Sequence, residues 1–225
     1  MLLSRASLAL SDGRKMEVSE STWESASIRS RIEEQARTDR ARLNGSGDPV
    51  FLFFLETYYS YLASVSSGDV PSAEEALALS NPDLDAWYLA VVDVNPDSFV
   101  KFDRHKTGEV SFRDGSRFEI VSSYLPSVTM TRVRLEEEAL KREPDRNNPK
   151  DIFGVYLYPL LASCSQGDIP SAEVVRSTWP ESEIYKWRDE VEAVNPQLFG
   201  EAVSVEETKA LEKKSSRRRV KSPPS

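Results

Sequence analysis

The sequence predicts a mostly helical α+β fold made of two homologous lobes, each a β-hairpin followed by about four helices. The first observation is a thirteen-residue stretch that occurs twice, at residues 62–74 and 161–173, with ten identical positions. The second is the spacing of about one hundred residues between the copies, which is a common domain size. The predicted boundaries are 1–100 for the first lobe, 101–205 for the second, and 206–225 for a disordered basic tail.

The similarity continues on both sides of the repeated stretch. Asp12-Gly13 precedes the first copy as Asp114-Gly115 precedes the second, and Asn95-Pro96 follows the first copy as Asn195-Pro196 follows the second. A tandem duplication of one unit explains this order.

Composition indicates a soluble, cytoplasmic protein without a membrane span. Hydrophobic residues make up 39% of the 225 residues and charged residues 29%. Cys164 is the only cysteine, so an internal disulfide framework is excluded and a reducing compartment is expected. The N-terminal residues contain no apolar run of signal-peptide length. The most apolar segment, residues 51–63, is too short to cross a bilayer.

Each lobe is expected to open with a β-hairpin. Asp-Gly supplies the positive φ of a tight turn, and the flanking residues alternate apolar with polar. The predicted strands cover residues 7–10 and 15–19 in the first lobe, and 109–112 and 117–121 in the second.

A strongly charged helix follows each hairpin. The first is expected to open with a Ser21–Glu24 capping box and to run to about Arg42. The second is expected to begin near Pro126 and to end before Pro144. Their apolar stripes are narrow, so both helices are expected on the lobe surface.

The next helix is apolar nearly all round and is expected at the centre of each lobe. It covers residues 51–64, with Phe54 buried, and 152–163, with Phe153 buried. Pro159 stands in the second copy where the first has Ser60, and it predicts a kink in the second copy alone.

The repeated stretch is expected to be architectural. A glycine after the buried helix suits a left-handed residue, Ser72 with Glu75 suits a helix N-cap, and one tryptophan per lobe is expected to fill the core. The structural residues of the repeat are Gly68, Pro71, Ser72, Trp87, Gly167, Pro170, Ser171 and Trp187.

The residues offer little for catalysis or cofactor binding. His105 is the only histidine, so neither a zinc site nor a Cys-His nucleophile is expected within one chain. Residues 103–114 resemble a calcium loop in spacing, but His105 stands at a ligand position and Asp114 is needed for the hairpin turn. Cys164 is expected to be a buried structural thiol. We therefore expect no catalytic site, no cofactor and no metal.

The C-terminal seventeen residues differ in charge from the rest. Residues 209–225 carry a net charge of +6, while residues 1–208 carry −14. An acidic body repels nucleic acid, so any such contact is expected only from the tail. The alternative function is therefore a nucleic-acid-associated accessory protein. The candidate contacts, to a protein or a nucleic acid, are Lys213, Lys214, Arg217, Arg218, Arg219 and Lys221.

Both copies resemble small phage proteins of the tail-assembly-chaperone type. The resemblance rests on the hairpin at residues 10–18 and on the block at residues 158–170, followed by Trp187 and Val194-Asn195-Pro196. It implies a non-enzymatic protein of the host cytoplasm that coats the tape-measure protein during tail assembly. The implied partner is the tape-measure or another tail protein, with self-association as a further expectation. No site residue is implied.

Overall fold

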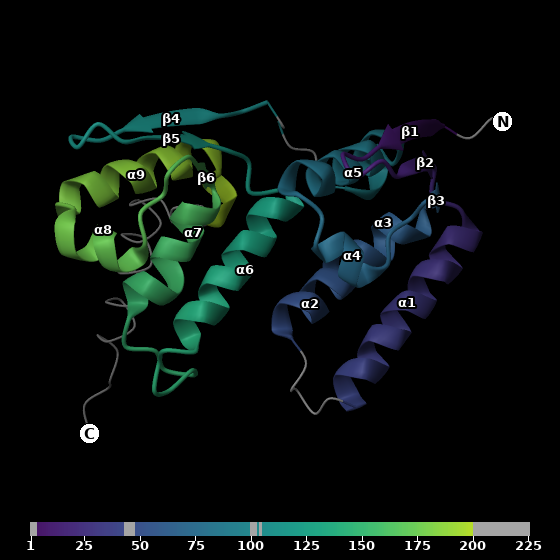
Figure 1. Ribbon diagram of the computed structural model, residues 1–225, viewed down its shortest axis with the longest axis horizontal. Helices are drawn as coiled ribbons and strands as arrows, with labels where there is room; N and C mark the ends of the chain where they lie inside the picture. Colours follow the sequence, from purple (N-terminus) through teal and green to yellow (C-terminus); the bar gives the residue numbers. More distant parts are fainter. Residues whose placement is uncertain (1–3, 43–47, 100–102, 104, 200–225) are drawn as a thin grey trace, which may run out of the picture.

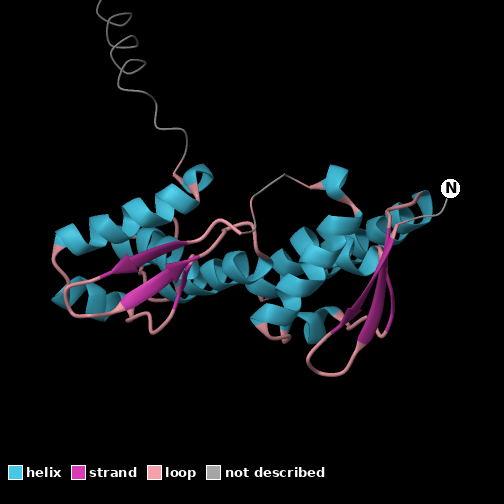
Figure 2. Cartoon of the chain, turned by 90° about the horizontal axis from the view of Figure 1, so that it is seen from above, coloured by secondary structure: helices cyan, strands magenta, loops and turns pink. Residues whose placement is uncertain are grey.

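The computed structural model describes residues 4–42, 48–99, 103 and 105–199, which form an α+β structure (Figure 1). The N-terminal half (residues 4–99) and the C-terminal half (residues 105–199) each contain a three-stranded antiparallel sheet and several helices (Figure 2). Within these residues, no helix has the length and apolarity needed to cross a bilayer. The tail at residues 206–225 lies outside the described residues.

Both predicted hairpins are confirmed, and each gains a third strand. The strands of the N-terminal half are β1 (Arg5–Ala9), β2 (Lys15–Ser19) and β3 (Ser66–Gly68), in that order. Those of the C-terminal half are β4 (Gly108–Ser111), β5 (Arg117–Ile120) and β6 (Ser165–Gln166). Gly13 and Gly115 form the hairpin turns with φ of 92° and 88°.

The third strand corrects the prediction for Gly68. The preceding helix ends at Ser64, so Gly68 is not its left-handed cap. Gly68 lies in β3 opposite Met16 with φ of 91°, and a Cβ there would lie 2.8 Å from the carbonyl oxygen of Lys15. The residue is glycine because the two backbones approach closely, as well as for its positive φ.

The helices follow the predicted order. Those of the N-terminal half are α1 (Trp23–Arg42), α2 (Pro49–Phe54), η1 (Leu55–Tyr59), α3 (Ser60–Ser64), α4 (Ala73–Leu77), α5 (Asn81–Val94) and η2 (Pro96–Ser98). Those of the C-terminal half are α6 (Pro126–Leu140), η3 (Phe153–Leu157), α7 (Tyr158–Ser163), α8 (Ala172–Thr178), α9 (Glu181–Val194) and η4 (Pro196–Leu198).

The central helix contains a π-helical segment in both halves, namely η1 and η3. The prediction that Pro159 would distort only the second copy is therefore wrong. The amide of Ser60, at the position of Pro159, donates to the carbonyl of Leu55 five residues earlier. The wider turn is thus formed with or without proline, and proline fits because the α-helical bonding is already interrupted.

Helix starts agree with the sequence better at α4 than at α1. Ser72 and Glu75 form the predicted capping box of α4. In α1 the reciprocal bonds instead join Thr22 and Ser25, one residue later than predicted. The cap shifts because the amide of Ser21 donates to Asn95 rather than staying in the helix start.

Each half has its tryptophan at the centre of its core. Trp87 and Trp187 are fully buried, and each indole nitrogen donates to a serine hydroxyl of the third strand, Ser66 and Ser165. Phe54 is also fully buried, as predicted. Phe153, which was predicted to be buried, is only partly buried, and the guanidinium of Arg176 lies over its ring at 5.6 Å from the centroid.

The two charged helices differ in environment. Helix α1 lies on the outside of the N-terminal half, as predicted (Figure 1). Helix α6 does not lie on the surface. It packs against α7 and η3 on one side and against α2 and α5 on the other. The prediction was wrong because α6 carries apolar residues on two sides, whereas only one was expected.

Candidate functional site

Helix α6 joins the two halves by adding side chains to the core of the N-terminal half. Met130 is 2% exposed and belongs to the same buried cluster as Phe54 and Trp87. Val133, three residues later and on the same side of the helix, packs against that cluster. The N-terminal half therefore receives an amphipathic helix on the face formed by α2 and α5.

A half-buried carboxylate holds the N-terminal end of α6. Asp85 of α5 accepts hydrogen bonds from the amide nitrogen of Ser127 at 3.0 Å and from its hydroxyl at 2.6 Å. Burial raises the pKa of Asp85, and the two bonds from Ser127 oppose that rise. The arrangement matches a helix N-cap supplied by another element, so it fixes the position of α6 along the face.

The same face is present in the C-terminal half, with different side chains. Tyr59 donates to the carbonyl of Pro71 at 3.0 Å, and Tyr158 donates to that of Pro170 at 2.8 Å. This pair, with the two buried tryptophans, sets the correspondence of positions. Ile152 then corresponds to Phe53 of α2, Tyr156 to Thr57, and Tyr185 to Asp85.

Three apolar side chains of this face are exposed. Ile152 is 60% exposed, Tyr156 51% and Tyr185 50%. Ile152 and Tyr156 are four residues apart and adjacent along the helical segment. We call Ile152, Tyr156 and Tyr185 the exposed apolar face. Of their counterparts, Phe53 and Asp85 are half-buried, whereas Thr57 is exposed as Tyr156 is. Within the described part of the chain, no second helix covers Ile152 and Tyr185 as α6 covers the α2–α5 face.

Sequence reasoning missed these three residues. For two of them the signal lies in the comparison of the two copies, because a polar residue in the first is replaced by tyrosine in the second. Asp85 becomes Tyr185 and Thr57 becomes Tyr156. An aromatic residue gained at an exposed position favours an interaction surface.

The residues singled out in the repeat take structural positions. The glycines lie beside the neighbouring strand, the tryptophans lie in the cores, and Ser72 and Ser171 accept hydrogen bonds at helix starts. The carbonyls of Pro71 and Pro170 accept the tyrosine hydroxyls. The six basic candidates, Lys213, Lys214, Arg217, Arg218, Arg219 and Lys221, lie outside the described residues.

The remaining chemical groups serve local structure. Cys164 is 1% exposed, and burial raises the pKa of its thiol to about 11. In the calcium-like loop, Asp103 accepts the amide of His105 and Asp114 accepts that of Ser116, which shapes two turns. Among the described residues, no three His, Cys, Asp or Glu side chains gather as metal ligands would.

Each sheet borders a shallow hollow, and we do not place the candidate functional site in either of them. The hollow over β4–β6 measures about 600 Å³ and that over β1–β3 about 520 Å³. The first is lined in part by the ion pair of Arg117 with Glu109, and the second by Glu17, which pairs with Arg5.

Comparison with known proteins adds no relative. No protein-family model, curated protein or solved structure matches this chain. The functional assignment therefore depends on the geometry of the exposed apolar face and its covered counterpart.

Proposed function

We propose that the chain is a tandem duplication of one helix-binding unit and acts as a non-enzymatic assembly chaperone or scaffold. Its partner is the tape-measure protein or another tail protein, as the resemblance implies. One observation carries the proposal: α6 occupies the α2–α5 face of the N-terminal half, while Ile152 and Tyr185, which correspond to Phe53 and Asp85 of that face, are exposed, with Tyr156 one turn from Ile152.

Matching internal bonds support the duplication. Each buried tryptophan donates to the serine at the start of the third strand, and each tyrosine donates to the proline carbonyl twelve residues later. The strand order is also the same in both sheets. Two lobes of one ancestry account for these pairs.

Helix α6 indicates what the exposed face accepts. It presents Met130 and Val133, three residues apart, to the N-terminal half. The partner segment is accordingly an amphipathic helix with apolar residues at intervals of three or four. The net charge of −14 on residues 1–208 keeps loaded complexes apart and in solution.

Co-expression with the tape-measure protein of the same genome tests the proposal. The chaperone raises the soluble yield of that protein, and the two co-purify at low salt with many chaperones per partner. Changing Ile152 and Tyr156 to serine abolishes the effect and leaves the melting temperature unchanged, because both side chains are exposed. Trp23→Ser is the control, since Trp23 is 89% exposed but lies on α1.

Two results count against the proposal. In the first, the tape-measure protein stays insoluble and does not co-purify. In the second, Trp23→Ser and the double serine variant reduce the soluble yield of the tape-measure protein equally, which indicates nonspecific association through exposed apolar side chains. Binding of nucleic acid that falls steeply with salt, and that is lost on deleting residues 209–225, favours the alternative function.

A further inference from the structure

The start of α9 lies beside a pocket that the proposed helix-binding role does not use. The pocket measures about 320 Å³, and its walls include Phe112, Trp179 and Pro180. The ring centroids of Phe112 and Trp179 are 4.4 Å apart, with the planes tilted by 41°. The rest of the lining is Arg113, Asp114, Thr178 and Glu183. The pocket therefore combines two aromatic rings with two carboxylates, of which that of Glu183 is the buried one.

The carboxylate of Glu183 is incompletely paired. The residue is 7% exposed. Its Oε1 lies 3.2 Å from Nε of Arg113, whereas its Oε2 is buried and has no hydrogen-bond partner. A buried carboxylate oxygen without a donor is unfavourable. A donor entering the pocket relieves that cost.

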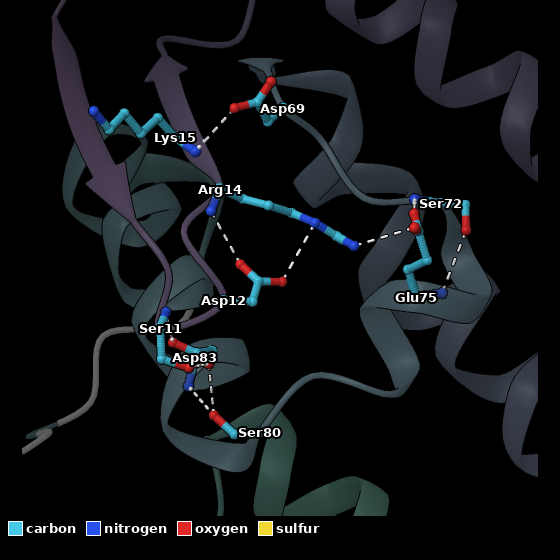
Figure 3. A network of polar contacts seen from close by, with 9 residues as sticks. All are labelled: Ser11, Asp12, Arg14, Lys15, Asp69, Ser72, Glu75, Ser80 and Asp83. Atoms are coloured by element: carbon cyan, nitrogen blue, oxygen red, sulfur yellow. Dashed lines mark hydrogen bonds and ion pairs between the residues drawn. The ribbon is translucent and has the colours of Figure 1, made fainter.

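In the N-terminal half, the carboxylate at the corresponding position is paired with nearby donors (Figure 3). Asp83, which corresponds to Glu183, accepts the amide of Ser11 at 2.9 Å and the hydroxyls of Ser11 and Ser80. The hydrogen bond from the Ser11 hydroxyl is the main cause of the lowered pKa of Asp83. Arg113 and Pro180 stand in place of the two serines in the C-terminal half. The two serine donors are thus replaced by a proline, which has no side-chain donor, and by one exposed guanidinium.

We infer that this pocket binds an arginine side chain. A guanidinium presents paired donors to a carboxylate and stacks its flat face on aromatic rings. The other charged side chains near the pocket do not bond to Oε2 of Glu183. Arg113 is 80% exposed, Asp114 is engaged with Ser116, and Lys186 donates to the carbonyl of Ser111.

The occupant is the arginine run at residues 217–219 of this chain. Seventeen residues separate Phe199 from Arg217, and an extended segment of that length spans roughly 55–60 Å. The way back from the end of α9 to its start at Glu181 is about 20 Å. The charges are complementary, +6 on residues 209–225 and −14 on the rest.

The test uses a fluorescent peptide with the sequence of residues 213–221. The receptor is the full chain with Arg217, Arg218 and Arg219 changed to alanine, so that its own arginines do not compete. Fluorescence anisotropy shows binding to this receptor, and adding Glu183→Gln weakens it about tenfold or more because the charge-assisted bonds are lost. Asp83→Asn, the matched change in the N-terminal half, leaves the affinity unchanged. A peptide with glutamine in place of arginine does not bind.

Occupancy by the chain's own arginines is tested with the same peptide. The wild-type chain binds it about tenfold more weakly than the alanine variant, because a tethered segment competes at a millimolar local concentration. Equal binding to these two chains overturns the assignment of the occupant. Equal loss with Glu183→Gln and Asp83→Asn, or loss with neither, overturns the pocket and leaves general attraction to an acidic surface.

Discussion

At the scale of single residues, one buried asparagine in each half connects the end of the hairpin to the last long helix. Asn195 is fully buried, its Oδ1 accepts the amide of Ser123 at 2.7 Å, and its Nδ2 donates to the carbonyl of Val121 at 2.9 Å. Asn95 makes the equivalent bonds to Ser21 and Ser19. The side chain thus satisfies backbone groups where the chain leaves the sheet.

Replacing Asn195 by alanine leaves those backbone groups buried without partners. The expected cost is about 1–3 kcal/mol of unfolding free energy for each orphaned group. Urea denaturation measures it. Gln197→Ala is the control, because Gln197 also contacts Ser123, but at the exposed surface. An equal, small effect of both substitutions would contradict the stabilising role of the Asn195 hydrogen bonds.

Burial of the Cys164 thiol predicts slow reaction with thiol reagents and a stability that depends on pH. Burial raises the pKa of Cys164 from 9.0 to about 11, so the native chain reacts with a thiol reagent at pH 8 far more slowly than the unfolded chain. Since the folded pKa is the higher one, the contribution to stability is complete below pH 9 and is lost as the pH rises through about 11. Wild type therefore loses stability over that range relative to Cys164→Val. Parallel pH profiles would show that the thiol does not titrate with folding.

At the scale of elements, Gly68 allows the third strand of the N-terminal half to approach β2 closely. Gly68 and Gly13 have nearly the same φ, 91° and 92°, but only at Gly68 would a Cβ meet a backbone atom, at 2.8 Å. Strain from the positive φ alone costs about 1–3 kcal/mol in either alanine variant. Gly68→Ala is expected to cost more than Gly13→Ala, because β3 must also move away from β2. Equal denaturation midpoints contradict this account.

Local patterns predicted most elements, and the failures share a cause. Hairpins follow from Asp-Gly and alternation, and α4 follows from Ser72 and Glu75, because the neighbouring residues make those structures. The third strands were missed because Ser66–Gly68 carries no strand pattern and pairs only through its backbone with β2. The burial of α6 was missed because its second partner is the other half of the chain, which local periodicity does not report.

At the scale of the whole molecule, α6 belongs to both cores. Met130 is buried with the N-terminal cluster, while Val128 is buried with the C-terminal cluster. Asp85 adds a polar contact from the N-terminal half at the start of this helix. The two halves are therefore expected to unfold together.

Met130→Ala tests this coupling. The lost packing is expected to cost about 2–5 kcal/mol and to destabilise both halves. Fluorine-labelled tryptophans report them separately, since Trp87 lies in one core and Trp187 in the other. Both signals are expected to disappear at the same, lowered urea concentration, whereas Glu138→Ala, on an exposed position of α6, leaves the midpoint unchanged. Two separate transitions would show that the halves are independent.

The candidate site also belongs to this scale. No local sequence motif connects the segments that carry Ile152, Tyr156 and Tyr185. The proposal that they form an interaction surface depends on how α6 packs in the other half. The sequence contains the differences Asp85 to Tyr185 and Thr57 to Tyr156, but only the packing of α6 on α2 and α5 leads us to propose a helix-binding role for the corresponding region of the C-terminal half.

Hydrogen exchange on the co-purified complex with the tape-measure protein tests the central claim most directly. Bound partner is expected to slow amide exchange at residues 152–157 and 181–188, which carry the exposed apolar face, and to leave residues 23–30 of α1 unchanged. Slowed exchange in α1 or on the outer strands, with residues 152–157 unaffected, would contradict the account.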